Sequence, residues 1–150
     1  MVKTVGIIGY GQFGAFVHTL GQRFFPDIEY KIYSRRAEID SQTFFSLEEA
    51  AQCDVLILCG SLGGYEEQLK AVVARMRVDS VLVDIATVKK HTEDLFQRYA
   101  ADRQYICTHP MFGPASYQKQ NEDVTGFRIV LTQSTLPTET ISVLRNRFAA

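Results

Sequence analysis

A glycine-rich turn between a strand pattern and a helix pattern constrains the fold of this chain more than any other feature. Residues 3–8 form a β-branched run, and apolar side chains recur at helical spacing from residue 13 to residue 24. The turn has the GxGxxG pattern, in the form Gly9-Tyr10-Gly11-Gln12-Phe13-Gly14. Between a strand and a helix, such glycines allow a tight turn, a close approach of the backbone to a pyrophosphate, and close packing of the helix on the strand. The turn predicts a dinucleotide site, and the alternative is a glycine-rich turn that binds no ligand.

Strand and helix patterns alternate through the rest of the 150 residues. The strand patterns cover residues 29–33, 55–59, 80–85, 105–108 and 127–131, and the clearest helix patterns cover residues 65–76, 88–99 and 137–148. We also expect a short edge strand at 43–45, a capping box at 46–49 and a loop at 113–125. The alternation predicts one α/β domain over residues 1–150 with a doubly wound, mostly parallel sheet of the Rossmann type. Functional residues are then expected directly after the carboxyl ends of the strands.

Composition and charge exclude several classes of function. The chain has 16 Lys and Arg against 17 Asp and Glu, so no overall basic field draws it to nucleic acid. No apolar run approaches the roughly 18 residues that a membrane span needs. The N-terminal residues continue directly into a strand pattern, which predicts a cytoplasmic protein, or a plastid protein if a transit peptide has been removed. Three cysteines without metal-ligand spacing (Cys53, Cys59 and Cys107) are expected to be reduced and buried, so we expect no metal site.

The residues after the second strand pattern indicate which cofactor is bound. A chain that prefers NAD carries an acidic residue about 20 residues after the glycines, where it binds the ribose 2′-hydroxyl. In this chain Ser34 occupies that place, and Arg35 and Arg36 follow it. A serine beside two guanidinium groups suits a 2′-phosphate, because guanidinium groups form charge-assisted, bidentate hydrogen bonds with phosphate. The segment predicts NADP as the cofactor, and the alternative is a solvated pair of arginines.

The segment after the third strand pattern is expected to contact the cofactor. It contains Cys59, Gly60 and Ser61. The glycine permits close approach of the backbone to a ligand, and the serine hydroxyl could bind a ribose or the pyrophosphate. A serine in a plain turn is the alternative.

Two more strand ends carry candidate catalytic residues. Thr87 could cap the helix that follows it or offer its hydroxyl to the site, and the two roles are compatible. Lys89 is either a solvated lysine in the first turn or a cation of the site, and composition favours the solvated state. His109 stands at the end of a strand and before a proline, where it is either a general base or a structural histidine. The other two histidines, His18 and His91, are expected to be solvated.

Four segments of the chain resemble the nucleotide-binding domain of the prephenate and arogenate dehydrogenases, the oxidative enzymes of tyrosine biosynthesis. They are VGIIGYGQFG, YSRR, DIATVK and THPMFGP. The resemblance covers essentially the whole chain, and the His-Pro-Met-Phe-Gly-Pro segment is its most specific part. The chain is particularly similar to the arogenate branch, which uses NADP.

The resemblance implies roles for several residues. His109 would accept the proton of the substrate's ring hydroxyl while hydride passes to NADP, and the ring would then lose carbon dioxide. Thr87 matches a serine of the family that lies near the histidine and the nicotinamide. The segment from Cys59 to Leu62 matches the cofactor-contacting loop, but Gly63-Gly64-Tyr65 departs from the family pattern.

The resemblance also implies a second, helical domain that makes the family's dimer and completes its substrate pocket. The chain stops within a helix pattern, so we expect that domain to be absent, a homodimer only where it is present, and little turnover of arogenate or prephenate by these residues alone. Two other functions compete with this one. They are a non-catalytic dinucleotide-binding module and another NADP-dependent reductase of the same fold, such as a 3-hydroxyacid or imine reductase.

Overall fold

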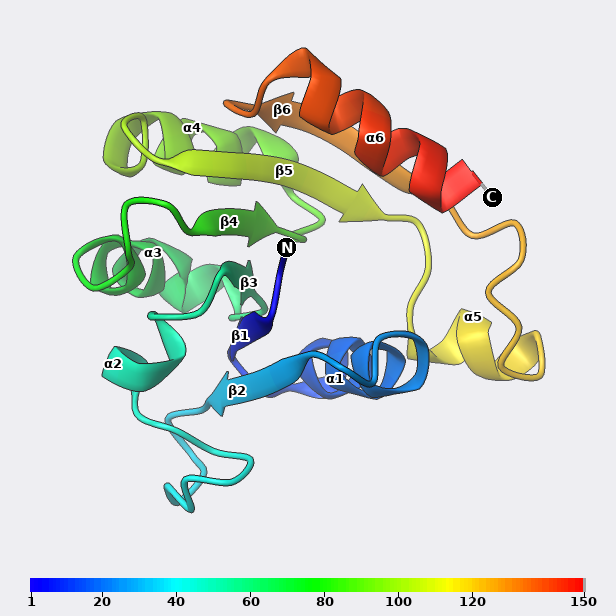
Figure 1. Cartoon of the computed structure of the whole chain (residues 1–150), viewed down its shortest axis with the longest axis horizontal. Coiled ribbons are helices and arrows are strands. Elements are labelled where there is room, and N and C mark those ends of the chain that lie inside the picture. The colour runs from blue at the N-terminus through cyan, green and yellow to red at the C-terminus, as the bar shows by residue number, and fades with distance from the viewer. Residues whose placement is uncertain (150) are drawn as a thin grey trace.

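The computed structural model describes residues 1–149, with side chains to residue 146, as a six-stranded sheet flanked by helices (Figure 1). The strands are β1 (Thr4–Ile8), β2 (Glu29–Tyr33), β3 (Val55–Leu58), β4 (Val81–Asp84), β5 (Gln104–Pro110) and β6 (Ile129–Ser134). The helices are α1 (Gln12–Phe24), α2 (Leu47–Ala50), α3 (Tyr65–Val73), α4 (Lys89–Tyr99), α5 (Pro114–Lys119) and α6 (Thr138–Ala149), with a 3-10 turn η1 (Leu62–Gly64).

The strand order is β2-β1-β3-β4-β5-β6. Strands β1 to β5 are parallel, and β6 runs antiparallel to β5. The predicted doubly wound, mostly parallel sheet is therefore confirmed. Because β2 pairs with one side of β1 and β3 with the other, the direction of winding reverses there. Ligands of such sheets bind at this reversal, outside the carboxyl ends of the strands.

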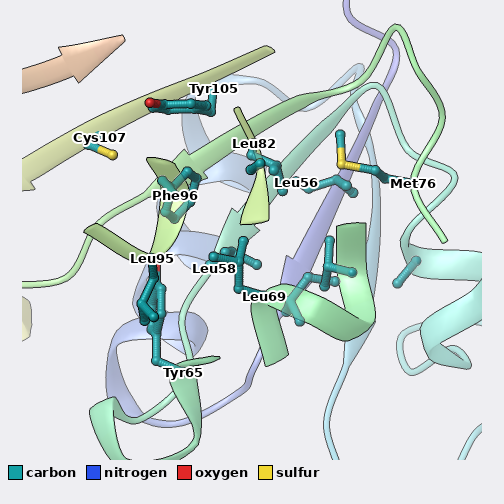
Figure 2. Packing of buried hydrophobic residues seen from close by; sticks show 14 of the residues in the cluster. Leu56, Leu58, Tyr65, Leu69, Met76, Leu82, Leu95, Phe96, Tyr105 and Cys107 are labelled. Carbon is teal, nitrogen blue, oxygen red and sulfur yellow. The ribbon is translucent and has the colours of Figure 1, made fainter. Parts of the chain in front are cut away.

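Helices cover both faces of the sheet, and two apolar layers fill the space between. The larger layer packs strand residues such as Leu56 and Leu82 against Leu69 of α3 and Phe96 of α4 (Figure 2). The smaller layer is built on three buried strand residues, Val5, Ile7 and Ile32. Burial on both faces explains why the central strands are apolar throughout rather than alternating.

The loop expected at residues 113–125 is wrong, because α5 forms within it. Pro114 occupies the first turn of this helix, where its missing N–H removes no hydrogen bond. Tyr117 is buried, and Arg23 of α1 donates a hydrogen bond to the Tyr117 hydroxyl. Helix α5 therefore lies beside α1, at one end of the molecule (Figure 1).

Two short features that the sequence predicts lie between β2 and β3. The edge strand expected at 43–45 is reduced to one parallel bridge between Phe44 and Ile32. The capping box is confirmed: Ser46 Oγ accepts the N–H of Glu49 at 3.2 Å, and the Glu49 carboxylate accepts the N–H of Ser46 at 3.0 Å. Among the described residues, no helix combines the length and the apolar character needed to cross a membrane.

Asp54, just before β3, joins the start of β1 to the start of β3. Its Oδ2 accepts the backbone N–H groups of Lys3 at 2.8 Å and Thr4 at 3.0 Å, and its own N–H donates to Thr4 Oγ1 at 2.9 Å. Arg77 pairs with Oδ1 at 3.1 Å. The two backbone N–H groups are the main cause that lowers the pKa of Asp54 from 3.8 to about 2.

We predict that Asp54→Asn lowers the free energy of unfolding at neutral pH by about 1–2 kcal/mol, because charged hydrogen bonds are lost at a side chain that is still partly solvated. Since the folded pKa lies below the unfolded one, the carboxylate stabilises the fold above about pH 4, and this contribution disappears as the pH falls towards about 2. Urea unfolding at several pH values measures the effect. The exposed Asp27→Asn is the control, and an identical pH dependence in both variants would contradict the prediction.

Candidate functional site

The glycine-rich turn lies between β1 and α1, and its three glycines meet different surroundings. Gly9 has φ = +102°, and a Cβ there would lie 2.9 Å from the carbonyl carbon of Cys59. A Cβ on Gly14 would lie 2.2 Å from the carbonyl oxygen of Gly9, so α1 packs directly on the turn. A Cβ on Gly11 would meet no atom within 4 Å. Gly11 thus faces open space at the position where such a turn admits a pyrophosphate.

The N-terminus of α1 fits an anion at this position. The helix begins at Gln12 with Gly11 as its N-cap, and neither a capping side chain nor an acidic residue lies in its first turn. The N–H groups of Gln12 and Phe13 have no acceptor within the helix, as in the first turn of any α-helix, and they lie at the positive end of its dipole. The residues present therefore suit the pyrophosphate of a dinucleotide.

Ser34, Arg35 and Arg36 follow β2 at the same edge of the sheet. Ser34 Oγ accepts the N–H of Arg36 at 3.3 Å. The side chain of Arg35 reaches the segment after β3, because its Nη2 lies 3.7 Å from the Cβ position of Gly64. Both arginines are exposed, and no carboxylate among the described side chains pairs with either. Two guanidinium charges are thus available to an anion near the end of β2.

The segment after β3 borders the turn on its other side. Cys59 is half-buried rather than buried, and burial raises the pKa of its thiol to about 12, so a thiolate nucleophile is excluded at neutral pH. Gly60 packs against Gln68 of α3, whose Oε1 would lie 2.3 Å from a Cβ at this position. Ser61 is exposed, and its hydroxyl has no hydrogen-bond partner among the described residues.

The carboxylate of Asp84, at the end of β4, has no exposed surface. Its Oδ1 accepts the Tyr65 hydroxyl at 2.6 Å and the Ala86 N–H at 2.9 Å. Its Oδ2 accepts the Thr92 hydroxyl at 2.9 Å and the Lys89 ammonium. Burial and the negative charge of Asp84 raise the pKa of Tyr65, which therefore remains a proton donor. Sequence analysis missed this cluster, and the only local signal for it was an acidic residue at the end of an apolar strand.

Lys89 is not solvated, so the expectation from sequence is wrong. Its side chain is 14% exposed and pairs with Asp84. Its ammonium also donates to the carbonyl oxygen of Thr108 at 2.6 Å. A cation with so little access to water needs an anionic partner, because an isolated buried charge is costly. Lys89 thereby joins the end of β4 to the end of β5.

Thr87 and His109 lie at the ends of these two strands. The structure excludes the capping role for Thr87, because the N-cap residue of α4 is Val88 and no side chain caps this helix. Thr87 is exposed, and within the described part of the chain its hydroxyl has no hydrogen-bond partner. His109 is half-buried and stands opposite Val130 of β6. Its imidazole likewise makes no hydrogen bond or ion pair with any described residue, so both side chains are available to a ligand.

The segment after His109 returns to the glycine-rich turn. The rings of Phe112 and Phe16 lie 6.2 Å apart between centroids, and a Cβ on Gly113 would lie 3.9 Å from the Phe13 ring. This return brings the His109 segment, which is distant in sequence, to the first turn of α1. All the predicted site residues consequently lie on one edge of the sheet, grouped around the turn, the β2–β3 side and the β4–β5 side.

The remaining histidines divide into two cases. His18 is half-buried rather than solvated, with ring centroids 6.2 Å from Tyr10 and 5.6 Å from Tyr30, and burial lowers its pKa. His91 is exposed, as expected. Among the described residues, no three His, Cys, Asp or Glu side chains are grouped as a metal ion would require.

Comparison with known proteins identifies a family for this chain and solved structures that share its fold. Arogenate dehydrogenase 1, chloroplastic, from Arabidopsis thaliana is 31% identical over 149 residues, which is 94% of this chain and 23% of the relative. The crystal structure of prephenate dehydrogenase from A. aeolicus in complex with hydroxyphenyl propionate and NAD+ superposes with a TM-score of 0.74 at 18% identity, covering 98% of this chain and 56% of that one. For Synechocystis arogenate dehydrogenase the TM-score is 0.68 at 18% identity, with 95% and 55% covered.

The chain therefore spans about a quarter of the length of its Arabidopsis relative and a little over half of the two solved structures. The family described as prephenate dehydrogenase, nucleotide-binding domain, matches residues 31–149. This range covers most of the sequence. It begins after the glycine-rich turn, so the pyrophosphate site expected at that turn rests on the local geometry and not on the family match. The chain belongs to the nucleotide-binding domain family of the prephenate dehydrogenases.

Proposed function

We propose that this chain binds NADP and forms the cofactor-binding part of an enzyme that oxidatively decarboxylates arogenate or prephenate in tyrosine biosynthesis. The observation that carries the proposal is one sheet edge that gathers the uncapped N-terminus of α1, two guanidinium groups and an imidazole without a partner among the described residues. Family membership supports the reaction class. The proposed substrate is a small molecule, with no nucleic acid or membrane involved.

The preference for NADP over NAD rests on the residues after β2. The strand ends at Tyr33, and Ser34, Arg35 and Arg36 follow before any acidic residue. A carboxylate at this place would repel a 2′-phosphate, whereas guanidinium groups attract it. The A. aeolicus relative is described with NAD+, so the fold by itself does not select NADP.

The chemistry assigned to this chain is proton transfer and positioning. When bound, the nicotinamide supplies the hydride acceptor. His109 in its neutral form accepts the proton of the ring hydroxyl, and Thr87, at the end of the adjacent strand, offers a hydroxyl to the same site. Removal of hydride from the hydroxyl-bearing carbon leaves a ring ketone, and aromatisation drives the loss of carbon dioxide from it.

We also propose a plastid location for the protein. The Arabidopsis relative is named chloroplastic. That name supports the plastid alternative to the cytoplasmic location that the N-terminal residues predict.

Substitution of Gly11 by alanine should separate cofactor binding from folding. The added methyl group would meet no atom within 4 Å, and φ at this residue is −81°, so we expect an unchanged melting temperature. The same methyl group would occupy the pyrophosphate position, so the affinity for NADP+ should fall roughly tenfold or more, about 1.4 kcal/mol. Calorimetric titration and thermal unfolding measure both effects. Gly14→Ala is the contrast, because its Cβ would lie 2.2 Å from Gly9 O and should also lower the melting temperature. Unchanged NADP+ affinity in Gly11→Ala would show that the pyrophosphate does not bind at this turn.

The double variant Arg35→Ala, Arg36→Ala should lose affinity for NADP+ and retain its affinity for NAD+. Each charge-assisted contact to the 2′-phosphate contributes about 1.5–3 kcal/mol, so we expect at least a roughly tenfold weaker binding of NADP+. Titration of both cofactors against parent and variant gives the comparison, and the exposed Arg98→Ala is the control. Equal affinities of the parent for the two cofactors would show that this loop does not select NADP.

His109→Asn should leave NADP+ binding nearly unchanged and lower turnover by about 10²–10⁴, because the proton acceptor is lost. The assay follows NADPH formation with arogenate and with prephenate. It uses the longest natural protein that contains this chain. His91→Asn, at an exposed position on α4, is the matched control. Turnover of His109→Asn close to that of the parent would assign this histidine to structure, and NADP+ binding without turnover of either substrate by the parent would favour a non-catalytic dinucleotide-binding module.

A further inference from the structure

One buried carboxylate holds both ends of the loop that carries Thr87. Asp84 Oδ1 accepts the N–H of Ala86, the residue before Thr87, at 2.9 Å. On the other side, the ammonium of Lys89, the first residue of α4, donates to Asp84 Oδ2, which also accepts the Thr92 hydroxyl at 2.9 Å. The chain on either side of Thr87 is therefore tied to the same carboxylate, through the backbone N–H of Ala86 and the side chain of Lys89.

The same cluster holds the segment that carries His109. The parallel ladder between β4 and β5 ends at the pair of Asp84 and Cys107, one residue before Thr108. On the far side of β5, the register with β6 shifts between Cys107 and Thr108. At this point Lys89 binds the Thr108 carbonyl at 2.6 Å, and Thr108 Oγ1 donates to the carbonyl oxygen of Asp84 at 2.8 Å. Because the Thr108 carbonyl and the His109 N–H belong to one planar peptide group, the bond from Lys89 constrains the orientation of the backbone at His109.

We infer that Asp84 and Lys89 are a positioning pair that holds Thr87 and His109 in a common orientation for proton transfer. The catalytic part of this inference rests on the proposed function. The side chains of Asp84 and Lys89 are 0% and 14% exposed, and their polar atoms bind protein groups, so they act through the other two residues. The Tyr65 hydroxyl keeps the Asp84 carboxylate oriented from the side of α3.

Stability alone does not account for a pair at this position. Apolar side chains of similar volume commonly stabilise a protein core as well as a buried ion pair does. The larger apolar layer around Leu82 and Phe96 shows that this part of the sheet is otherwise filled in that way (Figure 2). What the ion pair adds is direction, because Asp84 binds the N–H of Ala86, next to Thr87, and Lys89 binds the carbonyl oxygen of Thr108, next to His109.

The test compares Lys89→Met with the double variant Asp84→Asn, Lys89→Met. The single change leaves Asp84 as a buried charge without its cation, so the melting temperature should fall. The double change removes both charges, so the melting temperature should recover, but the bond to the Thr108 carbonyl stays lost. NMR of ring-labelled histidine follows His109 directly, with His18 and His91 in the same spectrum as internal references.

In the double variant we expect a recovered melting temperature together with a shifted His109 ring signal and unshifted signals for His18 and His91. A His109 signal that returns to its position in the parent would overturn the inference, because Lys89 would then only neutralise charge. The matched control applies the same two changes to the exposed pair Lys90 and Asp94 on α4, whose nitrogen and oxygen lie 2.7 Å apart. That control should leave all three histidine signals in place.

A milder variant keeps the inference testable if the charge variants do not fold. Tyr65→Phe removes one donor to Asp84 and should shift the backbone amide signals of Ala86 and Thr87. Tyr99→Phe removes a hydrogen bond of the same 2.6 Å length, to Glu66 between α3 and α4, and should leave those signals unchanged. Unshifted signals in Tyr65→Phe would overturn the inference. NADP+ titration of the parent is read separately, so that a failure to bind cofactor counts against the proposed function and not against the positioning pair.

Discussion

Parallel pairing of β1 with both β2 and β3 is the constraint on which the rest of the structure depends. A parallel pair cannot be closed by a tight hairpin, so each connection crosses a face of the sheet, and the carboxyl ends of β1 to β5 fall on one edge. The backbones at the end of β1 and after β3 come so close that Gly9 has no room for a side chain. The polar groups of the site are gathered by this geometry and not by proximity in sequence.

The edge so formed has two regions that differ in their electrostatics. Around Gly11 and the β2 end, positive groups have no partners within the described part of the chain: the first N–H groups of α1 and the guanidinium groups of Arg35 and Arg36. Around the ends of β4 and β5, the charges of Asp84 and Lys89 neutralise each other in a mostly buried pair. The first region can attract an anionic ligand, whereas the second is saturated internally and can only hold its neighbours in place.

Features that depend on neighbours in sequence could be predicted, and features that depend on distant partners could not. All the groups of the capping box lie within four consecutive residues that begin at Ser46, so the local sequence pattern was enough to predict it. The solvated state expected for Lys89 was wrong because its second acceptor, Thr108, is 19 residues away and becomes adjacent only when β4 and β5 pair. Helix α5 was missed because its glycine, proline and polar residues are equally typical of a loop, and the burial of Tyr117 against α1 stabilises it. The antiparallel direction of β6 could not be predicted, because an apolar strand at the edge of a sheet has the same sequence pattern in either direction.

The thiols of this domain have a consequence for its chemistry under oxidative stress. Burial raises the pKa of Cys53, and it raises those of Cys59 and Cys107 to about 12. Peroxide attacks the thiolate form, so oxidation to sulfenic acid should be slow at all three positions. Cys59 is the informative case, because it directly follows β3 beside the expected cofactor position, where a sulfenate would disrupt the close contact with Gly9 and Gly14. Because that thiol stays protonated at neutral pH, peroxide should leave the contact between Cys59 and the glycine-rich turn intact.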